Sequence, residues 1–220
     1  WDTLAVALPG ALVTGFIYAY SVYSGALQDA FQLSQADIDT IGMASSLVNL
    51  VTFTVGQIVD RTSIWFCCIL GGMTMMTAYF LFGLIALKHI AVVNPVPIFF
   101  VLGAAGNYGS AFMVASTFTV LTKNFSKQRS AVVSVAKAWV GVSAGVATAI
   151  FVGIVPGHDR DPQRFYFLYF IAILGGIVPL LVAPILRPLP MERSPPLREL
   201  AIPLSWRLPY CFAISALLIL

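Results

Sequence analysis

The chain has 220 residues, of which 59% are hydrophobic and only 10% are charged, and its formal net charge is +3. About a quarter of the residues of an ordinary soluble domain are charged, so this composition excludes a soluble globular protein. The small positive charge is scattered along the chain and indicates no nucleic-acid partner. The composition predicts an integral, multi-pass membrane protein in contact with the lipid bilayer.

Six long apolar segments follow one another along the chain, and each is long enough to cross a bilayer, which takes about 20 residues. They cover residues 3–23, 39–59, 64–87, 95–122, 130–155 and 165–186. Ser34 and Asp37 have the spacing of a helix-capping box before the second segment, and Pro95 suits the first turn of the fourth. Pro156-Gly157 predicts the end of the fifth segment. The predicted fold class is therefore all-α, with a six-helix transmembrane bundle over residues 1–186.

A proline-rich, charged stretch follows the sixth segment and predicts an extended linker over residues 187–207. A further apolar segment covers residues 208–220 and is too short to cross a bilayer. We expect it to be the truncated start of a seventh transmembrane helix. The chain would then be the amino-terminal part of a longer protein, whose carboxy-terminal six-helix half it lacks.

Basic residues divide unequally between the loops. Loops after the second, fourth and sixth segments carry eight of them: Arg61, Lys123, Lys127, Arg129, Arg187, Arg193, Arg198 and Arg207. The other loops carry three: Lys88, Arg160 and Arg164. Because positively charged loops stay inside, we expect both ends of the six-helix unit on the cytoplasmic side, or on the equivalent side of an organelle membrane.

Lys137 lies inside the fifth apolar segment, and no acidic residue occurs between Asp60 and Asp159. A charge at this depth costs at least about 2.5–3.5 kcal/mol, so such residues usually face a cavity or a partner. Three interpretations stay open. The lysine attracts an anion in a solute pathway, its long side chain reaches back to the headgroups, or it pairs with an acid outside this chain.

Three of the uncharged polar residues inside the apolar segments are candidates for a solute pathway: Tyr20 in the first, Asn49 in the second and Asn107 in the fourth. They can hydrogen-bond a solute, although the asparagines can equally join helices to one another. With Lys137, they are the residues that we expect to line a solute pathway. Three cysteines lie in apolar runs and are predicted to be buried, inert thiols: Cys67, Cys68 and Cys211. No catalytic set occurs in the apolar segments, so the sequence predicts neither an enzyme nor a metal or cofactor site.

The stretch Gly56-Gln57-Ile58-Val59-Asp60-Arg61 resembles the loop motif G-x-x-x-D-R of the major facilitator superfamily. Gly56 would let a neighbouring helix approach closely. Asp60 and Arg61 would pair across helices and release as bundles move, which gives the motif a gating role. The residues after Arg61 lack the further basic positions of the family motif.

Two longer stretches resemble the nodulin-like, monocarboxylate-transporter-like branch of that superfamily. In residues 15–42 the similar positions are Tyr18, Tyr20, Tyr23, Ser24, Leu27, Ser34 and Gln35. In residues 106–145 they are Gly106, Asn107, Asn124, Phe125, Arg129, Lys137, Gly141 and Ser143. The chain departs from the branch at Ser45-Ser46, where members often carry an acidic residue, and at Gln28, where they often carry a lysine.

The resemblance implies the amino-terminal half of a secondary transporter that moves a small organic solute by alternating access. Lys137 would favour an anionic solute. The altered loop motif and the missing acid suit an alternative, in which the chain is a degenerate transporter half that serves as an accessory subunit of a larger membrane complex. A third interpretation is that two copies of the bundle form the whole protein.

Overall fold

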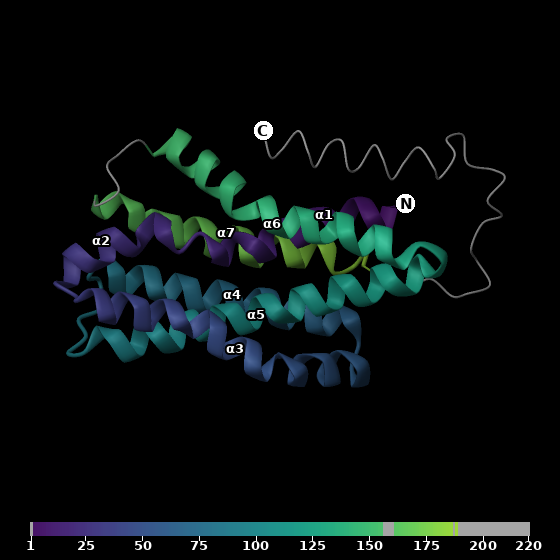
Figure 1. The fold of residues 1–220 in the computed structure, drawn as a ribbon, viewed down its shortest axis with the longest axis horizontal. Helices are drawn as coiled ribbons and strands as arrows, with labels where there is room; N and C mark the ends of the chain where they lie inside the picture. The colour runs from purple at the N-terminus through teal and green to yellow at the C-terminus, as the bar shows by residue number, and fades with distance from the viewer. Residues whose placement is uncertain (1, 156–160, 187, 189–220) are drawn as a thin grey trace.

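The computed structural model describes residues 2–155, 161–186 and 188. Within these residues the regular structure is entirely helical (Figure 1). The α-helices are α1 (Asp2–Thr14), α2 (Ser21–Phe31), α3 (Gln35–Arg61), α4 (Ile64–Ala86), α5 (Pro95–Asn124), α6 (Arg129–Ile154) and α7 (Tyr166–Val182). Short 3₁₀ helices are η1 (Gly15–Tyr18), η2 (Ser126–Gln128) and η3 (Pro162–Phe165).

Six helical segments are long and apolar enough to cross a membrane, which confirms the predicted fold class. They are Thr3–Phe31, Gln35–Arg61, Ile64–Ala86, Pro95–Asn124, Arg129–Ile154 and Pro162–Val182. The first span continues beyond its predicted end, and the second begins earlier than predicted. The predicted stop at Pro156-Gly157, the linker, the seventh helix and Cys211 lie outside the described residues.

The turn between the first and second spans is closed by local hydrogen bonds. Gln32 ends α2 in the left-handed conformation, with φ of 52°. The backbone N–H of Asp37 donates to Ser34 Oγ at 3.2 Å, and the backbone N–H of Ser34 donates to Asp37 Oδ2 at 3.0 Å. The predicted capping box is therefore confirmed, and it sets the start of α3 directly after α2.

Helix α4 packs against both α5 and α7, and glycines make the closest contacts. A Cβ on Gly71 of α4 would lie 2.6 Å from the carbonyl oxygen of Gly109 in α5, and a Cβ on Gly109 would lie 2.7 Å from that of Gly71. A Cβ on Gly72 would lie at a similar distance from the side chain of Pro179 in α7. Such positions let helix backbones approach closely, which is how membrane helices gain packing energy without a hydrophobic effect between them.

Two buried clusters occupy the two ends of the bundle. One is rich in aromatic rings and includes Tyr23, Phe82, Phe99, Phe151 and Phe167. The other includes Leu8, Cys67, Cys68, Met113, Val120 and Val135. Cys67 and Cys68 are free and buried, as predicted.

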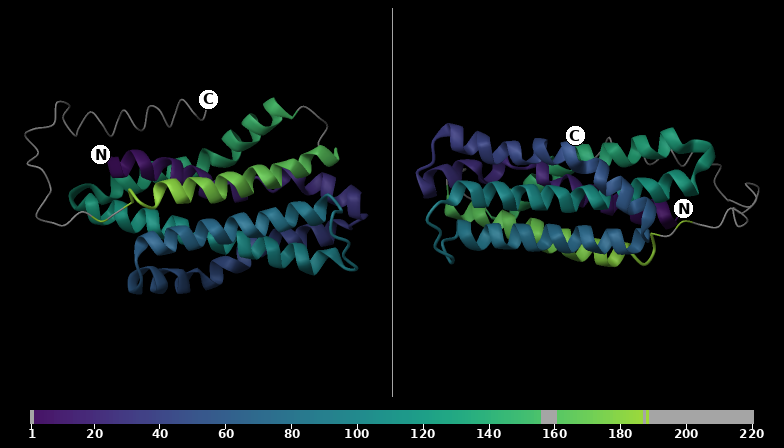
Figure 2. Two further views of the ribbon diagram at one scale, coloured as in Figure 1. Left: turned by 180° about the vertical axis from the view of Figure 1, so that it is seen from behind. Right: turned by 90° about the horizontal axis from the view of Figure 1, so that it is seen from below.

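Helices α3 and α6 form opposite edges of the bundle (Figures 1 and 2). In their most apolar 18-residue windows only 22% of α3 and 28% of α6 are buried, against 50% for the first, third and sixth spans. These two helices therefore offer the most surface to lipid or to a partner.

Candidate functional site

The first span is interrupted near its middle. It changes from α-helix to 3₁₀ helix over Gly15–Tyr18 and returns to α-helix at Ser21. Ser110 Oγ of α5 donates a buried hydrogen bond of 2.8 Å to the carbonyl oxygen of Thr14, immediately before the interruption. Irregular backbone at membrane depth needs such partners, because lipid supplies none.

Helix α6 crosses the first span at this interruption. A Cβ on Gly15 would overlap Ser143 Oγ and the carbonyl oxygen of Val140, both in α6. Only glycine fits at this crossing, so α6 is held directly against the break.

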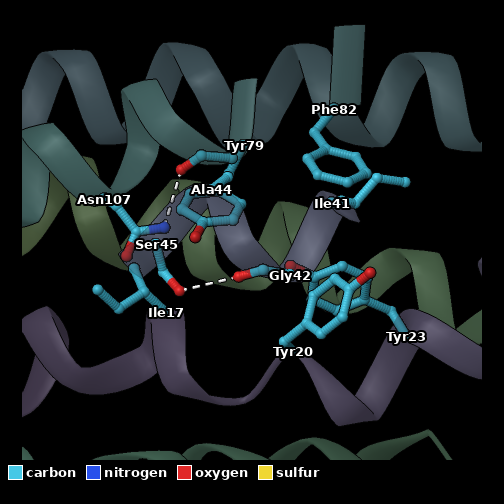
Figure 3. A pocket seen from close by; sticks show the side chains of 11 residues that line it. Ile17, Tyr20, Tyr23, Ile41, Gly42, Ala44, Ser45, Tyr79, Phe82 and Asn107 are labelled. Carbon is cyan, nitrogen blue, oxygen red and sulfur yellow. Dashed lines mark hydrogen bonds between the residues drawn. The ribbon is translucent and has the colours of Figure 1, made fainter. Parts of the chain in front are cut away.

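A small, partly open hollow of about 30 Å³ lies on the other side of the break (Figure 3). Side chains from the first span, α3, α4 and α5 line it: Ile17, Tyr20, Tyr23, Ile41, Gly42, Ala44, Ser45, Tyr79, Phe82, Gly103 and Asn107. Its volume suits about one water molecule, which needs two to four polar partners. Tyrosine, serine and asparagine side chains supply such groups here.

The hydrogen bonds of this small hollow leave the carboxamide oxygen of Asn107 available as an acceptor. Tyr20 Oη donates to the carbonyl oxygen of Ile38 at 2.9 Å and ties α2 to α3. Asn107 Nδ2 donates to the carbonyl oxygen of Gly103 at 2.8 Å. Within the described residues, the carboxamide oxygen of Asn107 has no hydrogen-bond partner. It can therefore accept a hydrogen bond from water or from a solute.

A larger open hollow of about 490 Å³ lies between the start of α2 and α6. Its lining is uncharged and mostly small: Tyr18, Ala19, Ser21, Ala144, Gly145, Thr148, Ala149 and Val152. The break in the first span thus separates a small polar hollow from a larger, open and uncharged one.

The structure brings together two of the four predicted pathway residues. Tyr20 and Asn107 line the small hollow. Asn49 and Lys137 lie elsewhere, on exposed faces of α3 and α6. Within the described residues, the Lys137 side chain makes no hydrogen bond or ion pair.

The predicted loop motif lies at the end of α3, where Gly56, Asp60 and Arg61 are exposed. No atom of the bundle lies within 4 Å of a Cβ built on Gly56, so no described helix makes the close approach expected there. Asp60 and Arg61 form no ion pair among the described residues. Their gating role stays a prediction.

A family model described as Nodulin-like matches residues 1–202. The chain belongs to the Nodulin-like family. No curated protein matches it. Family membership and the six spans make this Nodulin-like protein an integral, multi-pass membrane protein of the transporter type, in contact with the lipid bilayer.

Sequence reasoning missed several residues at the site of this Nodulin-like protein. Ser45, Tyr23 and Tyr79 line the small hollow, and Ser110 donates a hydrogen bond to the backbone before the break. Ser45 was visible as a polar interruption of the second span. Tyr79 carried no such signal, because a helix that is apolar all round does not indicate which side faces the bundle interior.

Replacing Tyr20 with phenylalanine in the Nodulin-like chain is expected to lower the free energy of unfolding by about 1 kcal/mol, because the bond to the Ile38 carbonyl is lost. The matched control is Tyr18→Phe, since the Tyr18 side chain is 65% exposed and makes no hydrogen bond in the described bundle. Thermal unfolding in detergent measures both variants. Equal stability of the two would contradict the assignment of this bond.

Proposed function

We propose that this chain is one half of a secondary transporter of the major facilitator type. It would carry a small organic solute by alternating access between this bundle and a second six-helix bundle. The observation that carries the proposal is the interrupted first span, with its small polar hollow on one side and its open hollow on the other. In many secondary transporters the solute binds near the midplane at interrupted helices, where unwound backbone and polar side chains can contact it.

Each of the four predicted pathway residues has a defined part in this proposal. Asn107 and Tyr20 would contact the solute beside the break. Lys137 lies eight residues before Gly145, which lines the open hollow, so the two are about 12 Å apart along α6. A lysine at that distance would attract an anionic solute toward the hollow. Asn49 would line the pathway only if a second bundle encloses the exposed face of α3.

Uptake by full-length protein in proteoliposomes tests the proposal, with small carboxylates and uncharged hydroxylated solutes as probes. Lys137→Ala is expected to lower carboxylate uptake about tenfold, which is roughly 1.4 kcal/mol, and Lys137→Arg is expected to retain it. Membrane insertion should be unchanged, because Lys137 is exposed and makes no hydrogen bond or ion pair with the described residues.

Three outcomes of this assay are informative. If Lys137→Ala lowers the uptake of charged and uncharged solutes equally, Lys137 acts in opening and closing of the transporter rather than in charge preference. Unchanged uptake in Lys137→Ala would remove the residue from the site. Failure of the unmodified protein to move any probe would count against transport.

The low burial of α3 and α6 also suits a second candidate function, an accessory subunit packed against other membrane proteins. A partner that co-purifies in fixed stoichiometry through mild detergent, together with absent uptake, would favour this candidate over transport.

A further inference from the structure

The side chain of Tyr79 in α4 is buried, but its hydroxyl is not used within the bundle. The residue is 2% exposed, and its hydroxyl makes no hydrogen bond to any described residue. Buried tyrosine hydroxyls usually have a partner, because an unpaired polar group away from water costs free energy. The Tyr79 hydroxyl is therefore available to a ligand that can reach it.

Gly106 of α5 holds the Tyr79 ring beside the small hollow. A Cβ on Gly106 would lie 2.6 Å from Cε2 of this ring and 3.1 Å from Cζ, the atom that bears the hydroxyl. A side chain at Gly106 would displace the ring, so the glycine fixes where the hydroxyl lies. Asn107 is the next residue of α5, and both Tyr79 and Asn107 line the same end of the hollow (Figure 3).

Tyr79 and Asn107 offer complementary hydrogen-bonding groups to this hollow. Asn107 Nδ2 donates to the carbonyl oxygen of Gly103 at 2.8 Å, which fixes the carboxamide and leaves its oxygen as an acceptor. The hydroxyls of Tyr20 and Ser45 already donate to backbone carbonyl oxygens, at 2.9 and 3.0 Å. The Tyr79 hydroxyl is thus a free donor, and the Asn107 oxygen is a free acceptor.

Size and charge limit the group that the small hollow can bind. Its volume of about 30 Å³ suits one group of the size of a water molecule. None of its lining residues is charged, so a carboxylate or an ammonium would be buried without a counter-charge. A carboxylate cannot donate to the Asn107 oxygen, and an ammonium cannot accept from the Tyr79 hydroxyl. An alcohol hydroxyl can do both.

We propose that the small hollow is a subsite for one un-ionised hydroxyl group of the solute, with Tyr79 as its hydrogen-bond donor. The solute hydroxyl accepts from Tyr79 Oη and donates to the carboxamide oxygen of Asn107. This inference rests on the proposed function and deepens it, since it makes an alcohol group a required part of the solute. The subsite is independent of any charge that the rest of the solute carries.

Saturation-transfer NMR on the full-length protein in lipid nanodiscs tests the subsite. The probes are glycerol, malonate and diaminopropane, which share a three-carbon chain and carry hydroxyl, carboxylate and ammonium groups respectively. We expect transfer from the protein to glycerol, and at least about tenfold less transfer to the two charged probes. No transfer to glycerol, or equal transfer to a charged probe, would overturn the proposal. This comparison needs no variant.

Tyr79→Phe removes the donor and keeps the ring. It is expected to lower the transfer to glycerol about tenfold, as loss of one buried hydrogen bond does. The variant should fold, because the hydroxyl that it removes bonds no described residue. The matched control is Tyr166→Phe on α7, since Tyr166 is 51% exposed and lines neither hollow. Equal transfer to glycerol in the two variants would remove Tyr79 from the subsite.

Binding is measured without a solute gradient, so the subsite and transport can fail separately. Glycerol binding that depends on Tyr79, in a protein that moves none of the probes, would reject transport and keep the hydroxyl site. Uptake of a probe without Tyr79-dependent binding of glycerol would keep transport and reject the hydroxyl site.

Discussion

Replacing Gly15 with alanine is expected to destabilise the bundle by about 3 kcal/mol, near the upper end of the usual cost of overpacking. The new methyl group would overlap Ser143 Oγ and the carbonyl oxygen of Val140. The Val140 carbonyl belongs to the backbone of α6, so a change of side-chain rotamer cannot relieve the overlap. The first span and α6 must separate at the break, and chemical or thermal unfolding in detergent would measure the loss.

The control for this prediction is Gly153→Ala on the same helix α6. No atom lies within 4 Å of a Cβ at Gly153, so this substitution should be neutral or stabilising by up to about 1 kcal/mol. If Gly15→Ala unfolds at the same temperature as Gly153→Ala, then α6 does not cross the first span as closely as described.

Replacing Asn107 with leucine is expected to reduce solute uptake by at least about tenfold if the chain transports as proposed. Leucine has a similar size but removes the carboxamide oxygen that is available in the small hollow. Loss of one hydrogen bond in a buried site costs about 1–3 kcal/mol, which corresponds to a factor of about 5 to 150 in binding or rate. Initial uptake rates of the full-length protein in proteoliposomes would measure the effect.

The control for Asn107 is the same substitution at Asn94, directly before α5. Asn94 is exposed and its side chain makes no capping hydrogen bond. Asn94→Leu should transport at the rate of the unmodified protein. Equal uptake by the two variants would remove Asn107 from the solute pathway.

Local sequence determined the class of the protein and the order of its spans. Length and continuity of an apolar run decide whether a helix can cross a bilayer, and both are properties of neighbouring residues. The capping box at Ser34 and Asp37 was predictable for the same reason, because its two hydrogen bonds close over three residues. Pro95 at the start of α5 needs only its own fixed backbone angle.

Only the tertiary structure decided where the polar groups meet. Tyr20 and Asn107 are far apart in sequence, and they line one hollow because α2, α3 and α5 pack together there. The break at Gly15–Tyr18 also depends on packing, since Ser110 and Ser143 come from other helices. The sequence shows Lys137 and the glycines of α6, but it does not show that their side of the helix is open. In a membrane, side chains that face lipid and side chains that face other helices are both apolar, so hydropathy cannot tell these faces apart.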